Sequence, residues 1–227
     1  MKVVFTTPNL NGPTKPFINA LEQSIPLVKA AGWDEGIVEE RGNPYISGAR
    51  SIMLRKALDA NPDVVVFLDY DLSWAPEDLL TLINTPGDVV AGVYRFKQDE
   101  PKYMGALIGD RPIVRDDGCI RADRVPAGFL KVTVDAVRRF ARAYPHLLYG
   151  DPLKPSVDLF NHGAIDGVWF GEDYAFSKRW IDLGGDIWIV PDLDLTHHSG
   201  DRAYPGNFHE FMLRQPGGSK EGVPYGE

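Results

Sequence analysis

The chain has few of the features that disulfide-bonded, exported or membrane-spanning proteins need. Its 227 residues include a single cysteine, Cys119, so an intrachain disulfide and a zinc site of several cysteines are both excluded. No apolar run approaches the roughly 20 residues that cross a bilayer. The apolar run after Met1 is too short for a secretory signal. We therefore expect a cytoplasmic protein without a transmembrane segment.

Positive charge is scarce as well. Lysines and arginines number 24 against 32 aspartates and glutamates, which gives a net charge of −8. A protein that binds nucleic acid through a basic surface requires clustered lysines and arginines, so the composition argues against a nucleic-acid partner. It does not argue against a nucleotide, which a few local groups and a cation can hold.

The first half of the chain alternates between strand-like and helix-like patterns. Short apolar stretches bounded by turn residues alternate with segments whose apolar residues recur at helical spacing. This order predicts an α/β fold with a mainly parallel central sheet, helices on its faces and right-handed crossovers. The expected strands are 2–7, 36–40, 64–72 and 88–94, and the expected helices are 14–31, with Pro26 as a kink or break, 47–61, with Ser47 as N-cap, and 76–84.

The second half is less regular. A polar segment, 96–124, is expected to reach over the carboxyl edge of the sheet. A length of 227 residues suits one large domain. We assign residues 1–213 to that domain and the Gly- and Pro-rich end, 214–227, to a flexible tail. Further strands are expected at 125–133 and 186–190, and further helices at 134–144 and 171–183.

Two aspartates follow a buried strand near the middle of the chain. The run Val64–Leu68 is wholly apolar, and Asp69 and Asp71 come next. In an extended chain these two side chains point to the same side, roughly 7 Å apart. The carboxyl ends of strands are where open α/β sheets bind ligands, and carboxylates suit Mg²⁺ or Mn²⁺. Alternatively, Asp71 merely precedes the helix at Pro76.

A second acidic pair, Glu172 and Asp173, opens the helix expected at 171–183. A carboxylate there can act as a general base towards a hydroxyl group. Alternatively, the two acids only complement the positive end of the helix dipole, which would also lower their pKa and weaken them as bases. The residues alone leave both interpretations open.

Two adjacent histidines, His197 and His198, lie near the end of the domain. Imidazole is a suitable ligand for Mn²⁺ beside carboxylates. In a strand only one of two neighbouring side chains faces a given side, so at most one of them is expected to face the ligand. The alternative is a pair of packed or surface histidines.

Several other residues have both a binding and a structural interpretation. Arg50 can pair with a phosphate or stack on a base, or it can be a solvated helix charge. Gly128 can let the backbone approach a ligand, or it can mark a strand bend. The aromatic residues Trp169 and Phe170 can form a platform for an acceptor sugar, or they can belong to the core.

These elements stand in an order that resembles the GT-A nucleotide-sugar glycosyltransferases, in particular the family-2-like group. The resemblance covers roughly residues 1–207 and implies a single GT-A, Rossmann-like domain with a small second sheet region on the acceptor side. It rests on Ser47-Gly-Ala-Arg50, Phe67-Leu-Asp-Tyr-Asp71, Ala127-Gly-Phe-Leu130, Gly171-Glu-Asp-Tyr-Ala-Phe176, and Ile187–Leu195 leading to His198-Ser-Gly200.

The resemblance also implies roles for these residues. Asp71 would bind Mn²⁺ or Mg²⁺, and Asp69 would face both the ribose and the metal. His198 is the preferred third ligand and His197 the alternative. Asp173, next to Glu172, matches the general base of the family. The remaining residues of the implied donor site are Thr6, Pro8, Glu40, Arg50, Tyr70 and Gly128.

The implied activity is metal-dependent transfer of a sugar, with inversion, from a nucleoside-diphosphate sugar to a hydroxyl acceptor such as a glycan. UDP is the commonest nucleotide of the family and is the expected one. The loops after Arg95 and after Gly200 are expected to close over the donor. One alternative is a nucleotidyltransferase, although the loop at Asn11-Gly-Pro13 has no lysine or arginine for a triphosphate. Another is a non-catalytic domain that binds a nucleotide sugar or glycan.

Overall fold

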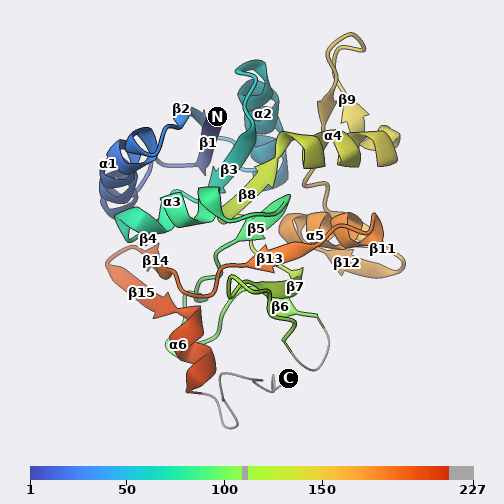
Figure 1. Ribbon diagram of the computed structural model, residues 1–227. Coiled ribbons are helices and arrows are strands. Elements are labelled where there is room, and N and C mark those ends of the chain that lie inside the picture. Colours follow the sequence, from blue (N-terminus) through green and yellow to red (C-terminus); the bar gives the residue numbers. More distant parts are fainter. Residues whose placement is uncertain (109–111, 215–227) are drawn as a thin grey trace.

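The computed structural model describes residues 1–108 and 112–214, which form an α/β fold around an eight-stranded sheet (Figure 1). The strand order is β2-β1-β3-β8-β5-β13-β7-β6. In that order the strands are β2 (Asp34–Arg41), β1 (Lys2–Asn9), β3 (Val64–Leu68), β8 (Phe129–Thr133), β5 (Val89–Ala91), β13 (Ile187–Ile189), β7 (Ile120–Arg124) and β6 (Ala106–Leu107).

Most strands of this sheet point the same way. Strand β1 runs parallel to β2 and β3, and β5 runs parallel to β13. Strand β8 is antiparallel to both of its neighbours, and β7 is antiparallel to β13 and β6. All strands except β8 and β7 therefore share one direction, which confirms the predicted mainly parallel sheet.

Helices cover both faces of the sheet. Helices α1 and α3 pack on one face, and α2, α4 and α5 pack on the other (Figure 1). Every residue of β3 is buried between these layers, which explains its uninterrupted apolar sequence. The bounds are α1 (Lys15–Ala30), α3 (Pro76–Asn84), α2 (Ile46–Asp59), α4 (Val134–Ala143) and α5 (Glu172–Asp182).

Two local expectations for the helices are wrong in detail. Helix α1 continues past Pro26 rather than breaking there. Helix α2 begins one residue before Ser47, with Tyr45 as its N-cap residue. The Ser47 hydroxyl is therefore not a cap, and it bonds instead to Nδ1 of His162 at 3.0 Å.

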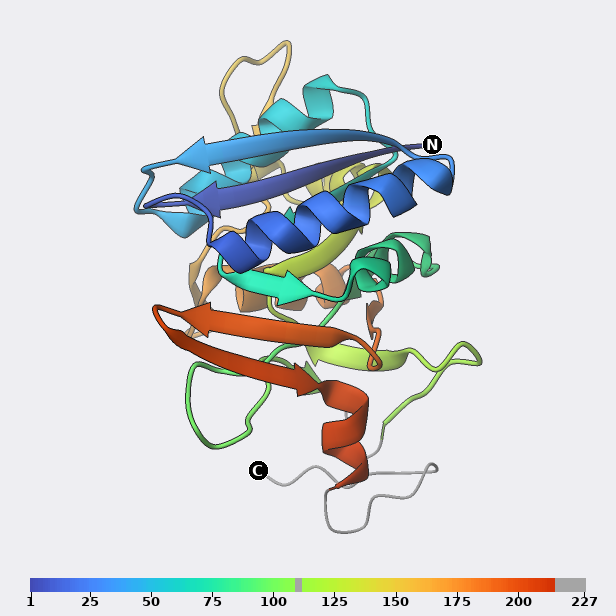
Figure 2. The ribbon, with the colours of Figure 1, turned by 90° about the vertical axis from the view of Figure 1, so that its left-hand side faces the viewer.

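A second, three-stranded antiparallel sheet lies beside the first and confirms the expected small sheet region. Its order is β15-β14-β4, with β4 (Leu72–Trp74), β14 (Asp194–Ser199) and β15 (Arg202–Asn207), and α6 (Phe208–Leu213) follows. The turn between β14 and β15 lies on the side to which β1 and β2 point (Figure 2). The expectation of a closing loop after Gly200 is wrong, because β15 pairs along its whole length with β14.

The rest of the second half consists of short paired segments. One two-stranded sheet joins β9 and β10, and another joins β11 and β12 just before α5. Among the described residues, no helix combines the length and apolar character needed to cross a bilayer. The expected tail, 214–227, lies outside the described residues apart from Arg214. The bounds are β9 (Leu148–Tyr149), β10 (Ser156–Val157), β11 (Gly163–Ile165) and β12 (Val168–Phe170), with a 3₁₀ turn at Pro145–Leu147.

Candidate functional site

The segment after β3 is a turn and not the extended chain that the sequence suggested. The amide of Leu72 donates to the carbonyl oxygen of Asp69 at 3.1 Å. The chain turns here because it leaves the central sheet and enters β4 of the second sheet. Asp69 and Asp71 consequently have different side-chain partners.

Arg50 joins the two acidic elements that the sequence singled out. Its side chain is buried on α2, and its guanidinium donates through Nη2 to Oδ1 of Asp69 at 2.8 Å and through Nη1 to Oε1 of Glu172. Burial acts to lower the pKa of Arg50, but the two carboxylates outweigh it and the pKa is raised. In this structure Arg50 holds β3 and α5 together, and its expected contact with a base or phosphate stays a prediction.

Asp69 has a second partner in Tyr94, which follows β5. The Tyr94 hydroxyl donates to Oδ2 of Asp69 at 3.2 Å, and burial together with this carboxylate raises the pKa of Tyr94. Gly128 lies against both groups. A Cβ atom at position 128 would lie 2.2 Å from Oη of Tyr94 and 2.3 Å from Oδ2 of Asp69. The glycine is thus explained by this internal contact rather than by the approach of a ligand.

Asp71 lies between a lysine and a histidine. Nζ of Lys97 contacts Oδ2 of Asp71 at 2.5 Å, and Nε2 of His197 lies 3.6 Å from the same oxygen. Burial acts to raise the pKa of Asp71, but the contacts with His197 and Lys97 hold the pKa below its usual value. Asp71 is therefore an ionised carboxylate, and the ammonium of Lys97 already contacts one of its oxygens.

The two histidines of β14 face opposite sides, as the alternation in a strand requires. His197 is buried and directs its imidazole to Asp71, with Nδ1 2.8 Å from the carbonyl oxygen of Arg95. Because a carbonyl only accepts, Nδ1 carries the proton and Nε2 faces Asp71. His198 instead places Nε2 2.8 Å from Oγ of Ser73. The imidazole of His197, and not that of the preferred metal ligand His198, thus faces the carboxylate of Asp71, and the metal role of either histidine stays a prediction.

Asp173 is the second carboxylate of α5 and differs from its neighbour Glu172. Its Oδ1 accepts a hydrogen bond from the amide of Tyr174 at 2.8 Å. Burial raises the pKa of Asp173 to about 6, the charge of Glu172 adds to this, and Arg50 opposes it. The expectation that the helix dipole lowers this pKa is wrong because desolvation dominates. Glu172 is held by Arg50, so Asp173 is the better general base of the two.

The residues at Asp71 match a divalent cation in chemistry. Oδ2 of Asp71 and Nε2 of His197 are an oxygen and a nitrogen ligand that face each other, and the carbonyl of Arg95 orients the imidazole. The oxygens of Asp69 accept hydrogen bonds from Arg50 and Tyr94, and its expected role as a metal ligand stays a prediction. No group of three or more such ligands occurs within residues 1–108 and 112–214. A site of this kind needs further oxygens, which substrate phosphates commonly supply.

Some of the remaining residues of the expected donor site lie at the carboxyl edge of the central sheet, and one lies in its interior. Pro8 and Glu40 lie side by side at the ends of β1 and β2, where Glu40 pairs with Lys56 at 2.8 Å. Tyr70 lies in the turn after β3, and its carbonyl accepts from Thr14. Thr6 is fully buried, and its hydroxyl donates to Val66 at 3.2 Å. Its side chain therefore lies in the interior, and the expected contact of this position with the donor stays a prediction.

The two expected acceptor residues lie on β12, immediately before α5. Trp169 is 72% exposed, and its ring centroid lies 6.1 Å from that of His162. Phe170 is half-buried and pairs in register with Gly163. Trp169 is therefore a surface residue and not part of the core, which leaves its indole accessible beside the carboxylates of α5.

Two residues of this cluster carried no distinct signal in the sequence. Tyr94 ends an apolar strand pattern, so its ring looks like ordinary core. Lys97 lies in a polar stretch where a lysine is unremarkable, and only the fold brings it to Asp71. For Tyr94 the position alone could have indicated a functional role. It ends the expected strand at the carboxyl edge of the sheet, and ligands bind at that edge.

No protein-family model and no curated protein matches the chain. Among solved structures, a crystal structure of S. aureus TarS 1–349 is similar, with 15% identity, a TM-score of 0.44 and coverage of 93% of this chain and 63% of that one. The complex with UDP-GlcNAc has 11% identity, a TM-score of 0.43 and coverage of 90% and 58%. The complex with UDP has 13% identity, a TM-score of 0.44 and coverage of 93% and 63%. This chain thus spans about three fifths of those chains.

Proposed function

We propose that the protein is a glycosyltransferase that moves a sugar from a nucleoside-diphosphate sugar to a hydroxyl acceptor. The observation that carries the proposal is the Arg50 bridge, which brings Asp69 at the end of β3 and Glu172 at the start of α5 onto one guanidinium. The bridge joins the end of β3 to the start of α5, and the proposed cation ligand Asp71 and the proposed base Asp173 lie next to its two carboxylates in the chain. The neighbourhood is shared, because Asp69, Asp173 and Asp71 all act on the pKa of the buried Tyr94 hydroxyl.

Asp71 and His197 would hold Mn²⁺ or Mg²⁺ together with the donor diphosphate. When bound, the cation supplies Lewis-acid stabilisation of the charge that develops on the departing diphosphate. Asp71 contributes an ionised oxygen, and His197 contributes Nε2 in the orientation fixed by its bond to the Arg95 carbonyl. UDP is the nucleotide we propose, since it is the commonest one in the family that the sequence resembles.

Lys97 would change partners when the donor binds. In this structure its ammonium lies on the same oxygen of Asp71 that would bind the cation, and two positive charges there repel each other. Lys97 lies on an exposed segment, so its long side chain can move without moving the backbone. We propose that it then contacts a phosphate oxygen of the donor, where its charge is favourable.

Asp173 would take the proton from the acceptor hydroxyl. Its pKa of about 6 makes it a stronger base than an ordinary aspartate while it stays mostly ionised at pH 7. The hydroxyl oxygen would form a bond to the anomeric carbon as the bond from that carbon to the diphosphate breaks. A single displacement from the opposite face inverts the anomeric configuration, without a covalent sugar–enzyme intermediate.

The test is a turnover assay with UDP-glucose, UDP-galactose and UDP-GlcNAc, each with and without Mn²⁺, in which released UDP is measured. We expect release from at least one donor that requires Mn²⁺ and is lost in Asp173→Asn. A product of inverted anomeric configuration by NMR supports the single displacement. Donor binding without turnover under all conditions contradicts the proposal and favours a non-catalytic nucleotide-sugar-binding domain.

The nucleotide is tested separately by a thermal-shift screen of UDP, GDP, CDP and TDP. A ligand that binds only the folded state raises its stability by mass action, so a shift with one nucleotide identifies the base.

The nucleotidyltransferase alternative is tested by incubation of the protein with UTP and a sugar phosphate. Pyrophosphate formation from them, without transfer of a sugar, overturns the glycosyltransferase proposal in favour of a nucleotidyltransferase.

A further inference from the structure

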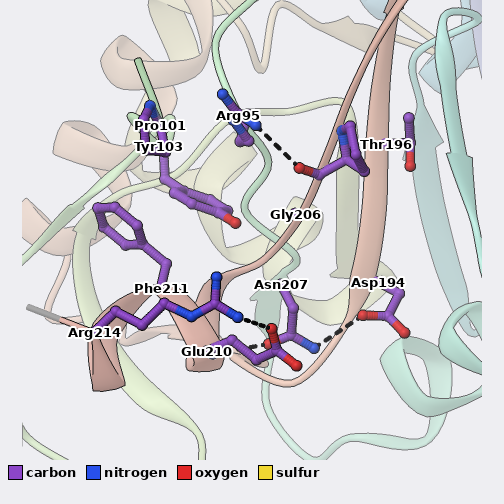
Figure 3. A pocket seen from close by; sticks show the side chains of 11 residues that line it. Arg95, Pro101, Tyr103, Asp194, Thr196, Gly206, Asn207, Glu210, Phe211 and Arg214 are labelled. Atoms are coloured by element: carbon purple, nitrogen blue, oxygen red, sulfur yellow. Dashed lines mark hydrogen bonds and ion pairs between the residues drawn. The ribbon is translucent and has the colours of Figure 1, made fainter. Parts of the chain in front are cut away.

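A pocket of about 460 Å³ lies between the segment at 101–103, strand β15 and helix α6 (Figure 3). Sites that bind small ligands have volumes of about 300–1,000 Å³, so this pocket is large enough to hold one. Arg95 lines it with its side chain, while its carbonyl oxygen accepts from His197. The pocket therefore begins at the residue that orients the proposed cation ligand.

Two aromatic rings form one wall. The ring centroids of Tyr103 and Phe211 are 4.8 Å apart with an angle of 42° between the planes, and both side chains are only partly buried. Both rings lie at the pocket in Figure 3. Gly206 makes room for this arrangement, because a Cβ atom there would lie 2.1 Å from Oη of Tyr103. The wall is a fixed apolar surface, held from behind by Phe208.

The rest of the lining is rich in hydrogen-bond acceptors. Nδ2 of Asn207 donates to Oδ1 of Asp194 at 3.0 Å, and Arg214 donates to Oε2 of Glu210 at 2.9 Å. An ionised carboxylate can accept about four hydrogen bonds. Asp194 and Glu210 thus keep lone pairs for a ligand that brings hydroxyl donors.

The charges of the pocket do not favour an anion. Arg95 and Arg214 balance Asp194 and Glu210, so the lining is neutral overall. Both guanidiniums also have partners. Arg95 donates to the carbonyls of Pro205, Gln98 and Asp99, and Arg214 donates to Glu210. Nε of Arg95 is buried and has no hydrogen-bond partner, but the lining as a whole carries no net charge. A neutral ring with many hydroxyls suits aromatic faces beside carboxylates and an amide.

We propose that this pocket binds a neutral sugar unit of a glycan acceptor. The inference rests on the proposed function, which it deepens by adding a second acceptor subsite apart from Trp169. Stacking on Tyr103 and Phe211 supplies the affinity, and Asp194 and Glu210 accept hydrogen bonds from the sugar. The predicted acceptor is an oligosaccharide and not a single sugar or a charged lipid headgroup.

The experiment is ligand-observed NMR titration of the full chain with maltose, cellobiose, lactose and N,N′-diacetylchitobiose. At least one of these disaccharides should bind, and Phe211→Ala should weaken that binding about tenfold through loss of stacking and apolar contact. Leu213→Ala is the matched control, because Leu213 is exposed on the same helix and does not line the pocket. It should bind the disaccharide as the wild type does.

A second variant keeps the test decisive should Phe211→Ala fail to fold. Glu210→Ala removes an exposed carboxylate of the pocket and an exposed ion pair, so folding should persist while binding weakens several-fold. Thermal melting of each variant monitors folding. Failure of all four disaccharides to bind, or equal binding by wild type and both pocket variants, overturns the proposal.

Titration of UDP with Mn²⁺ separates this inference from the proposed function. Wild type and Phe211→Ala should bind UDP equally, since Phe211 is not one of the residues of the proposed donor site. Binding of UDP without binding of any disaccharide removes the subsite and leaves the proposed function standing. Binding of a disaccharide without UDP removes the proposed function and leaves a saccharide-binding pocket.

Discussion

Nε2 of His197 on β14 lies 3.6 Å from Oδ2 of Asp71, which lies in the turn between β3 and β4. The carbonyl of Arg95 accepts from Nδ1 and so turns Nε2 towards the carboxylate oxygen. The ammonium of Lys97 lies on the same oxygen in this structure.

Replacement of Lys97 tests whether its ammonium and a divalent cation compete for Asp71. Lys97→Met should raise the affinity for Mn²⁺ in the absence of nucleotide about threefold to tenfold, because the competing charge is gone. The same variant should bind UDP more weakly in the presence of Mn²⁺. Electron paramagnetic resonance of free Mn²⁺ measures the first effect and calorimetry the second.

The control for that variant is Lys102→Met, which removes a lysine of the same segment that pairs with the exposed Glu100. It should leave both affinities unchanged. An unchanged Mn²⁺ affinity in Lys97→Met would show that Lys97 does not compete with the metal.

Arg50→Met should destabilise the fold strongly. The variant leaves Asp69 and Glu172 without their shared partner, and breaking a buried ion pair in this way costs about 3 kcal/mol or more. Arg55→Met on the same helix is the control, because Arg55 pairs with the more exposed Asp59 and should cost about 0.5 kcal/mol or less. Urea denaturation of both variants measures the difference, and equal losses would contradict the bridging role of Arg50.

Gly128→Ala should disturb the Asp69–Tyr94 contact directly. The new methyl group would lie well within van der Waals distance of both side chains, so we expect a loss of about 1–3 kcal/mol of stability. Gly36→Ala is the matched control, since its nearest atom, Cγ2 of Val4, would be at an ordinary 3.5 Å. Thermal unfolding of the two variants compares them. A Gly128→Ala protein as stable as the wild type would mean that Asp69 and Tyr94 can move apart at little cost.

Asp173 predicts a pH dependence of both activity and stability. Activity should rise as the pH increases through about 6, because only the ionised carboxylate accepts a proton. The folded-state pKa of about 6 lies above the ordinary 3.8, so folding favours the protonated form, and stability falls as the pH rises from about 3.8 to about 6 and stays lower above that. Asp173→Asn should therefore raise the melting temperature at pH 7.5 and have little effect at pH 4. A melting-temperature gain that is the same at both pH values would contradict the raised pKa.

Much of the fold could be predicted because its pattern is local. The apolar run of β3, the helix α3 and the Gly-bounded helix α5 each carry their own signals of burial, start and stop. The second sheet could not be predicted in full, because β4 is only Leu72–Trp74 and is defined by its pairing with β14. Pairing between segments so distant in sequence leaves no local periodicity.

The candidate site, like the fold, could be predicted only in part. Asp71, Asp173 and a histidine of β14 were identifiable from residue type and position in the chain. Their partners were not, because Arg50 looks like a solvated helix charge and Lys97 like an ordinary surface lysine. Each contacts a carboxylate that lies tens of residues away in sequence. The choice between His197 and His198 depended on strand register, which only the pairing of β14 with β4 determines.

Calorimetric titration of UDP, with and without Mn²⁺, into wild type, Asp71→Asn, His197→Ala and His198→Ala tests the central claim most directly. The account predicts that Mn²⁺ strengthens UDP binding by the wild type, that this gain is lost in Asp71→Asn and reduced at least tenfold in His197→Ala, and that it persists in His198→Ala. Binding of UDP that is the same with and without Mn²⁺, or that depends on His198 and not on His197, would contradict it.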